Sequence, residues 1–225
     1  MTDYLEQREV VAQAAKYLAQ HGFLSATGGN ISVRLNEPEG LAITPSNFDY
    51  MKMTLEDICI LGVDGEILNA RLKPSVESSL HAAIYQTRPD VNAIIHTHQV
   101  YPSTLAIINK PIPALFDEQV RFLGRAVEII PYAPSGTGLL KNKVAKFVGN
   151  HHNAFMMANH GALVLGDTME RAIHNVEVLE KCSLAYLLAI CSGKKVSKIP
   201  LLVREVAFSK LRSDQKKAEE ANSNI

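Results

Sequence analysis

Hydrophobic residues near the start of the chain recur at intervals of three and four positions, which predicts an amphipathic helix. Between residues 2 and 21 the apolar positions include Leu5, Val11 and Leu18, with polar side chains between them. Gly22 follows directly, and glycine commonly ends a helix because it adopts the left-handed conformation without strain. We therefore expect the first helix to span residues 2–21.

The first third of the chain continues with shorter apolar runs that are typical of strands. Runs around "ISVR" and "LAIT" are followed by "ICILGVDGEILNA", in which an Asp-Gly pair separates two apolar stretches. Asp-Gly favours the tight turn of a two-residue hairpin. This part of the chain is therefore predicted to form antiparallel sheet.

Helical and extended segments alternate in the rest of the chain. The segment "SVESSLHAAIYQTR" has a helical apolar face and leads into the strand-like "NAIIHTH". The longest helical pattern, of about 20 residues, starts at Thr168. The remaining pieces are interpreted as a short helix, a strand, a helix and two strands: "VYPSTLAII", "VEIIPY", "GLLKNKVAKFV" and "AFMMANHGALVLG". Together these elements predict an α/β or α+β sandwich built on a largely antiparallel sheet.

The domain organisation is predicted to be simple. No low-complexity linker divides the 225 residues, so we expect one domain over residues 1–210. Residues 211–225 are charged and poor in apolar side chains, which predicts a disordered C-terminal tail.

Composition argues against two classes of binding partner. Basic and acidic side chains number 23 each, and this zero net charge argues against nucleic acid or a membrane surface as a partner. The three cysteines form no Cys-x-x-Cys pair and are interpreted as buried thiols in a reducing compartment. The N-terminus does not have the pattern of a signal peptide, and no apolar run approaches 18 residues. We therefore expect a soluble, cytoplasmic protein.

Two histidines on one strand are the first candidates for chemistry. Because side chains alternate between faces along a strand, His96 and His98 point to the same side. Zinc commonly takes two such histidines and a ligand from a distant segment, for which His160 and Glu77 are candidates. The alternative is structural, with one histidine exposed and the other hydrogen-bonded in the core. The other histidines are interpreted as structural or solvent-facing: His21, His81, His151, His152 and His174.

Four motifs in order along the chain strengthen the metal hypothesis. They are "TGGNISVR", "ITPSNFDYMKMTLEDICIL", "KPSVESSLHAAIYQTRPDVNAIIHTH" and "ANHGALVLGDTMERA". This ordered set resembles the class II aldolase/adducin family over nearly the whole domain. The resemblance implies a three-layer α/β/α sandwich around a mainly antiparallel sheet. It also implies a homotetramer with active sites at subunit interfaces.

The same resemblance implies a divalent metal, usually zinc, bound by His96, His98 and His160. Glu77 would be a fourth ligand and a proton-transfer group, and manganese, cobalt or iron suit the same ligand atoms. The family's aldolases have glutamate at this position and its epimerases have aspartate, so Glu77 favours aldol chemistry. A metal acting as a Lewis acid beside a carboxylate suits retro-aldol cleavage, because it stabilises the enediolate that forms.

A glycine-containing turn is the candidate site for an anion. In "TGGN" two glycines let the backbone approach an anion closely, although one glycine pair is also common in ordinary loops. The resemblance assigns the substrate phosphate to six positions: Thr27, Gly29, Asn30, Ser46, Asn47 and Ser75. Asn47 replaces an expected glycine and Val76 an expected serine, so a carboxylate is an alternative to phosphate. Asn47 can adopt a left-handed conformation and donate a side-chain N–H.

The second acid/base group is expected in "LFDEQVRF". The family's aldolases place here a tyrosine that acts from a neighbouring subunit, and this chain has Asp117, with Glu118 or neither as alternatives. The complete ligand set predicts a class II aldolase, a metal-dependent lyase that cleaves a small ketose phosphate. The alternatives are a decarboxylase, a dehydratase or a 4-epimerase acting on a sugar or sugar-acid phosphate. A non-enzymatic, adducin-like assembly protein is disfavoured because it would have lost ligands.

Overall fold

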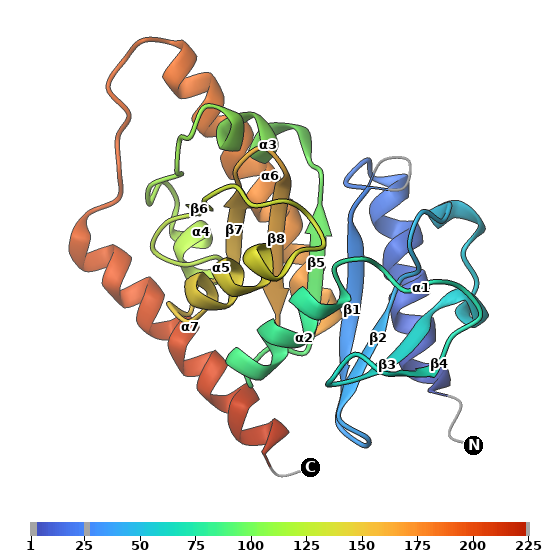
Figure 1. Ribbon diagram of the computed structural model, residues 1–225. Helices are drawn as coiled ribbons and strands as arrows, with labels where there is room; N and C mark the ends of the chain where they lie inside the picture. The colour runs from blue at the N-terminus through green and yellow to red at the C-terminus, as the bar shows by residue number, and fades with distance from the viewer. Residues whose placement is uncertain (1–3, 25–27, 224–225) are drawn as a thin grey trace.

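An eight-stranded mixed sheet forms the centre of the molecule (Figure 1). The computed structural model describes residues 4–24 and 28–223. The strands lie in the order β4-β3-β2-β1-β5-β8-β7-β6; β6 and β7 are parallel, and the other neighbours are antiparallel. The strands are β1 (Asn30–Leu35), β2 (Gly40–Ile43), β3 (Cys59–Gly62), β4 (Ile67–Asn69), β5 (Ala93–Thr97), β6 (Glu128–Ile130), β7 (Ala154–Met157) and β8 (Gly161–Gly166).

Helices cover both faces of this sheet. On one face lie α1 (Leu5–Gln20), α3 (Val100–Ile107) and α6 (Met169–Cys191), and on the other α2 (Ser78–Thr87) and α5 (Gly138–Val148). The alternation along β5 divides its side chains between two cores, because Ile95 packs with α1 and α6 whereas Ile94 packs with α2 and α5. This arrangement confirms the predicted three-layer α/β/α sandwich. Shorter elements are η1 (Tyr50–Lys52), η2 (Leu55–Asp57) and α4 (Asp117–Phe122).

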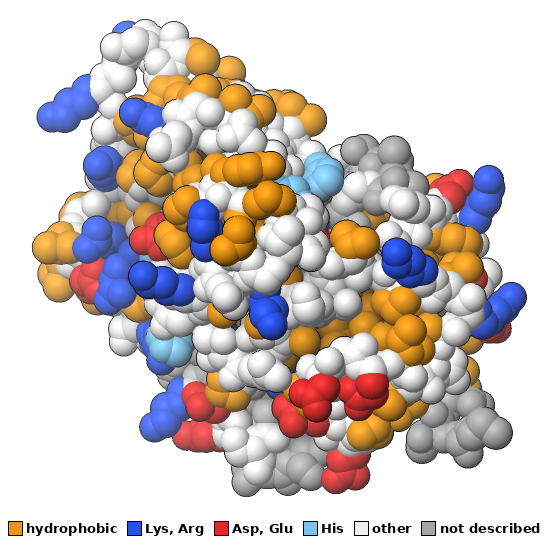
Figure 2. Space-filling view, viewed as in Figure 1, with side chains coloured by type: hydrophobic (Ala, Val, Ile, Leu, Met, Phe, Trp, Pro, Cys, Tyr) orange, Lys and Arg blue, Asp and Glu red, His pale blue; other side chains and the backbone are white. Residues whose placement is uncertain are grey.

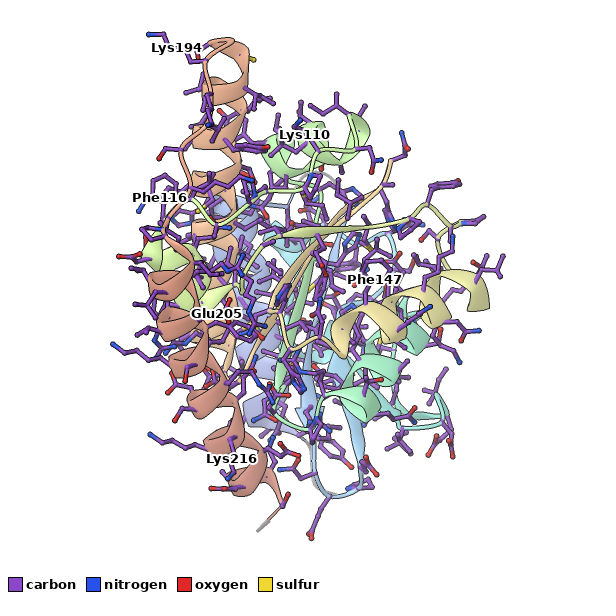
Figure 3. The ribbon with its side chains drawn as sticks, turned by 90° about the vertical axis from the view of Figure 1, so that its left-hand side faces the viewer. Lys110, Phe116, Phe147, Lys194, Glu205 and Lys216 are labelled. Atoms are coloured by element: carbon purple, nitrogen blue, oxygen red, sulfur yellow. The ribbon has the colours of Figure 1, made fainter. Side chains whose placement is uncertain are left out.

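The C-terminal segment corrects the expectation of a disordered tail from residue 211. Instead, α7 (Leu201–Asn222) is a continuous helix that runs along one side of the molecule (Figure 3). Its buried residues are Phe208, Leu211 and Gln215, whose spacing of three and four positions places them on the face that meets α4. The tail is therefore part of an amphipathic helix. Most of its residues are charged or polar, and its buried face is a narrow stripe. None of the described helices is long and apolar enough to cross a membrane.

The cysteines agree only in part with the expectation of buried thiols. All three are free, and Cys59 and Cys182 are buried. Cys191, the last residue of α6, is exposed.

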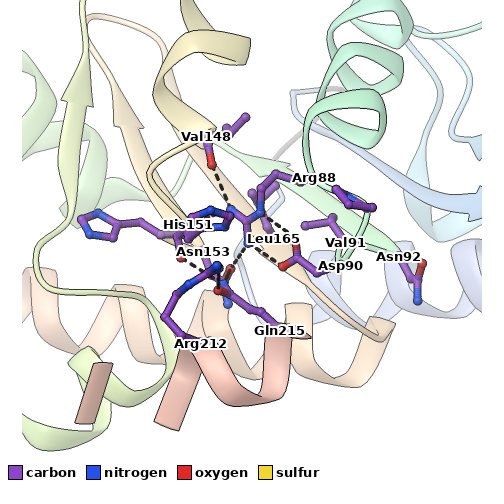
Figure 4. Close-up of polar contacts among 12 residues, drawn as sticks. Arg88, Asp90, Val91, Asn92, Val148, His151, Asn153, Leu165, Arg212 and Gln215 are labelled. Atoms are coloured by element: carbon purple, nitrogen blue, oxygen red, sulfur yellow. Dashed lines mark hydrogen bonds and ion pairs between the residues drawn. The ribbon is translucent and has the colours of Figure 1, made fainter. Parts of the chain in front are cut away.

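A buried arginine joins α2 to the segments around β7 and α7 (Figure 4). Arg88 is completely buried, and its guanidinium donates two hydrogen bonds of 2.7 Å to the two oxygens of Asp90. It also donates to the carbonyl oxygens of Val148 and His152 and to Oδ1 of Asn153. These five bonds use all five N–H groups of the side chain. Gln215 on α7 donates to the same Asn153 oxygen, so the network also holds the C-terminal helix.

The variant R88A is expected to lower the free energy of unfolding by about 3–5 kcal/mol, because it leaves the buried Asp90 carboxylate without its cation. Urea denaturation followed by circular dichroism measures the change. The matched control is K52A, which removes an exposed ion pair with Asp49 and is expected to cost less than about 1 kcal/mol. Equal losses in the two variants would contradict the proposed role of the Arg88 network.

Candidate active site

The predicted histidines meet where β5 ends and β8 begins. His96 lies on β5 and His98 just beyond it, while His160 immediately precedes β8. Because the two strands pair in antiparallel register with Thr97 opposite Ala162, the end of one strand meets the start of the other. Figure 2 shows histidine side chains at the molecular surface at this end of β5.

The ligand atoms of these histidines converge. They all lie within 4.8 Å of one another, and Nε2 of His96 is 3.1 Å from Nε2 of His98. Glu77 completes the group, with Oε2 3.5 Å from His96 Nε2 and Oε1 3.4 Å from His160 Nε2. In a tetrahedral zinc site with bonds of about 2.1 Å, ligand atoms lie about 3.4 Å apart. The donor atoms and their spacing therefore fit a divalent cation.

The environment keeps His96 in the protonation state that a metal ligand needs. Its Nδ1 lies 2.8 Å from the carbonyl oxygen of Ala162, and because a carbonyl only accepts, Nδ1 carries the proton. Nε2 is then left with a lone pair directed at the cluster. Burial lowers the pKa of His96 to about 4 even though Glu77 opposes this shift, so the ring is neutral at pH 7. Partial desolvation of its ring also lowers the pKa of His98, although the residue as a whole is exposed.

Glu77 is a buried but ionised carboxylate. Only 4% of it is exposed, and burial alone would raise its pKa. His96 and hydrogen bonds from Asn30 and Ser135 outweigh burial and lower the pKa to about 2. Nδ2 of Asn30 donates to Oε2 over 2.8 Å, and Oγ of Ser135 donates to Oε1 over 2.7 Å. Glu77 is therefore negatively charged at neutral pH and points into the cluster.

Two glycines allow the segments of the cluster to approach one another. A Cβ atom on Gly161 would lie 2.3 Å from the carbonyl oxygen of Thr97 and 2.8 Å from Cδ2 of His98. A Cβ atom on Gly29, which has φ of +90°, would lie 2.5 Å from the carbonyl oxygen of His96. Gly29 therefore packs against the strand that carries the histidines, in addition to any contact with an anion.

The variant G161A is expected to weaken binding of a divalent ion by roughly 10- to 100-fold, because the added methyl group displaces the backbone of Thr97 and the ring of His98. Competition with a chromophoric chelator measures the affinity. The control is G193A: Gly193 follows α6, and a Cβ there meets no atom within 4 Å, so any effect of its positive φ is confined to stability. Unchanged metal affinity in G161A would contradict this assignment.

The predicted anion site lies beside the histidines. One pocket is lined by the glycine turn, by the segments that contain Ser46 and Ser75, and by the cluster. Its lining residues are Gly28, Gly29, Asn30, Pro45, Ser46, Asn47, Ser75, Val76, Glu77, His96, His98, Ser135 and His160. Asn47 has φ of +54°, which confirms that this residue adopts the left-handed conformation usually taken by glycine. Thr27, which was also predicted to contact the anion, lies outside the described residues.

Asp117 does not lie with the other predicted site residues. It is exposed at the first turn of α4 and is not among the residues that line the pocket. The alternative, Glu118, forms an ion pair of 2.8 Å with Lys181. A catalytic role for Asp117 stays a prediction.

Sequence reasoning missed two residues of the pocket region. Ser135 lies in the loop between β6 and α5 and donates a hydrogen bond to Glu77, and no motif in the sequence marks it. Tyr50 is buried, and its hydroxyl donates to the carbonyl oxygen of Gly29 over 2.6 Å. Tyr50 thus supports the glycine turn through this hydrogen bond, a contact between distant segments that the local pattern of "NFDYMKM" does not encode.

Comparison with known proteins agrees with this geometry. A family profile described as the class II aldolase and adducin N-terminal domain matches residues 9–187. The chain belongs to the class II aldolase and adducin family. The histidine cluster has the donor set for the divalent metal that class II aldolases use.

Three relatives show the range of activities in this class II aldolase family. The 5-deoxy-D-ribulose 1-phosphate aldolase of Bacillus thuringiensis serovar kurstaki is 36% identical over 183 residues, covering 80% of this chain and 84% of the relative. The 3-oxo-tetronate 4-phosphate decarboxylase of Haemophilus influenzae is 31% identical over 204 residues, covering 87% and 92%. A solved L-fuculose 1-phosphate aldolase has a TM-score of 0.86 at 31% identity, covering 92% and 96%. The family thus includes both aldolases and a decarboxylase.

Proposed function

We propose that this chain is a metal-dependent aldolase that cleaves a small ketose 1-phosphate to dihydroxyacetone phosphate and an aldehyde. The observation that carries the proposal is the convergence of three imidazoles and the Glu77 carboxylate in one pocket beside the glycine turn. The aldolases among the relatives support the same reaction class. Zinc is the proposed ion because three nitrogen ligands and one carboxylate suit it.

In the proposed reaction one carbon–carbon bond breaks and one proton moves from oxygen to carbon. The bond between C3 and C4 breaks, the C4 hydroxyl loses its proton as the aldehyde forms, and C3 gains a proton to give dihydroxyacetone phosphate. A divalent ion held by the histidines would supply a Lewis acid that stabilises the negative charge of the enediolate. We assign the transfer of the proton to Glu77, which is ionised at pH 7 and therefore ready to accept it.

Neutral donors around the pocket are proposed to hold the phosphate. Asn30, Ser46, Asn47 and Ser75 line it together with the backbone of Gly29. We propose that Asp117 acts on the substrate of a neighbouring subunit in a homotetramer, because its own pocket does not contain it. These assignments rest on the spatial grouping of the residues and on the family.

A decarboxylase acting on a 3-oxo acid phosphate is the second candidate function. The decarboxylase relative from Haemophilus influenzae, matched over 87% of this chain, favours it. Decarboxylation and retro-aldol cleavage both leave an enediolate or enolate, so the same charge stabilisation serves both reactions.

Product analysis tests the proposal and separates the two reactions. The zinc-loaded protein is incubated with a panel of ketose 1-phosphates, and dihydroxyacetone phosphate is detected with a coupled dehydrogenase. A parallel incubation with 3-oxo acid phosphates is assayed for carbon dioxide. The aldolase proposal expects dihydroxyacetone phosphate from at least one ketose. Carbon dioxide release without cleavage of any ketose would replace it with the decarboxylase.

A further inference from the structure

Glu77 is held from two sides by neutral hydrogen-bond donors. Asn30, at the start of β1, donates to Oε2, and Ser135 donates to Oε1. Each carboxylate oxygen has two lone pairs, so accepting one hydrogen bond leaves a second lone pair free. The same two oxygens lie 3.5 and 3.4 Å from Nε2 of His96 and His160, so both remain close enough to share an ion with the histidines.

Ser135 reaches Glu77 from a distant part of the chain. It lies 58 residues along the sequence, in the loop that connects β6 to α5. The loop is anchored by Thr137, whose hydroxyl donates to the carbonyl oxygen of Pro134 and accepts from the backbone N–H of Leu140 at the start of α5. Position 135 is therefore fixed independently of the histidines.

The same loop passes directly over the residue before Glu77. A Cβ atom built on Gly136, which has φ of +70°, would lie 3.6 Å from Cβ of Val76. Val76 and Ser135 both line the pocket. The loop therefore forms one wall of the site, and the hydrogen bond from Ser135 is the polar contact that joins this wall to the carboxylate.

A buried carboxylate is sensitive to the loss of such a donor. Glu77 is 4% exposed, so water cannot readily replace a missing partner. Without the hydroxyl of Ser135, Oε1 would lose its hydrogen bond and keep only its contact with His160. The carboxylate could then rotate about its last side-chain torsion. Residues that orient a metal ligand in this way commonly affect affinity as much as 10- to 100-fold.

We propose that Ser135 is a positioning residue for Glu77. Its hydrogen bond to Oε1 orients the carboxylate toward the three imidazoles and thereby sets how tightly the cluster holds a divalent ion. The inference deepens the proposed function and rests on it for the catalytic consequence. The effect on ion binding concerns only residues of this chain and is measured without substrate.

The test compares three variants of the full chain. S135A removes the hydroxyl, S135T keeps it, and T137A loosens the same loop without touching Glu77. Zinc affinity is measured by competition with a chromophoric chelator, and the visible spectrum of the cobalt-loaded protein reports the coordination. S135A is expected to bind zinc about 10-fold more weakly and to change the cobalt spectrum. S135T is expected to lie within about threefold of the wild type. T137A is expected to lose thermal stability and to lose less zinc affinity than S135A, because it keeps the hydroxyl that contacts Glu77.

Two results would overturn the proposal: an S135A affinity equal to that of the wild type, or an equal loss in T137A. Kinetics provide a separate readout, in which S135A should lower kcat more than it changes KM for the cleaved ketose phosphate. If S135A binds zinc weakly but the wild type cleaves no ketose, the aldolase proposal fails and the role of Ser135 stands. If the wild type cleaves a ketose and S135A binds zinc normally, the aldolase proposal stands and the role of Ser135 fails.

Discussion

Replacing His96 with alanine is expected to remove nearly all bound metal and to lower kcat/KM for ketose phosphate cleavage by at least about 10³-fold, equivalent to about 4 kcal/mol of transition-state stabilisation. The reason is geometric, because Nε2 of His96 lies 3.1 Å from Nε2 of His98 and 3.5 Å from Oε2 of Glu77. Elemental analysis of the purified variant measures the metal, and the coupled assay for dihydroxyacetone phosphate measures the rate.

A second variant separates ligand loss from damage to the core. His96 is buried, whereas His98 is exposed, so H98A removes a ligand with little change in packing. H98A is expected to lose most of its metal while retaining the unfolding temperature of metal-free wild type. The control H21A alters an exposed histidine that bonds the backbone at the end of α1 and should keep one ion per chain. Full metal retention in both H96A and H98A would refute the three-histidine site.

The variant E77Q is expected to lower kcat by about 10²- to 10⁴-fold at saturating metal, because the amide cannot carry the proton. Glutamine has nearly the same shape, and its N–H can donate to the hydroxyl of Ser135, so the pocket should keep its geometry. Metal affinity should therefore fall less than in H96A. Steady-state kinetics at several metal concentrations distinguish the loss in kcat from the loss in metal occupancy.

The matched control for this substitution is E177Q. Glu177 also accepts a hydrogen bond from a hydroxyl group, that of Tyr17 over 2.8 Å, but it does not line the pocket. E177Q should keep kcat within about threefold of the wild type. A kcat for E77Q as high as that of E177Q would remove Glu77 from the proton transfer.

Local patterns predicted most of the fold. The first helix, the hairpin of β3 and β4 at an Asp-Gly turn and the long helix α6 all lie where their periodicity indicated. The parallel pairing of β6 with β7 depends on which edges meet after α5 packs on the sheet, and no short pattern encodes that choice. In α7, the stripe of Phe208, Leu211 and Gln215 includes a polar residue whose burial depends on its bonds to His151 and Asn153.

The candidate site shows a similar division. The alternation along one strand predicted that His96 and His98 share a side. His160 and Glu77 were candidates from the sequence, and the resemblance to a family assigned them to the same site. Ser135 could not be predicted, because a serine in a turn has no periodic signal and its contact spans 58 residues. Contacts of this kind depend on how loops from separate elements meet at the end of a sheet.

The most direct test of the account titrates metal into chelator-stripped protein while the release of dihydroxyacetone phosphate from a ketose 1-phosphate is followed. The account predicts no cleavage without metal, a linear rise in rate as zinc is added, and saturation at one ion per chain. Cleavage by the stripped protein at the rate of the zinc-loaded protein, or no cleavage of any ketose 1-phosphate with one ion bound per chain, would contradict it.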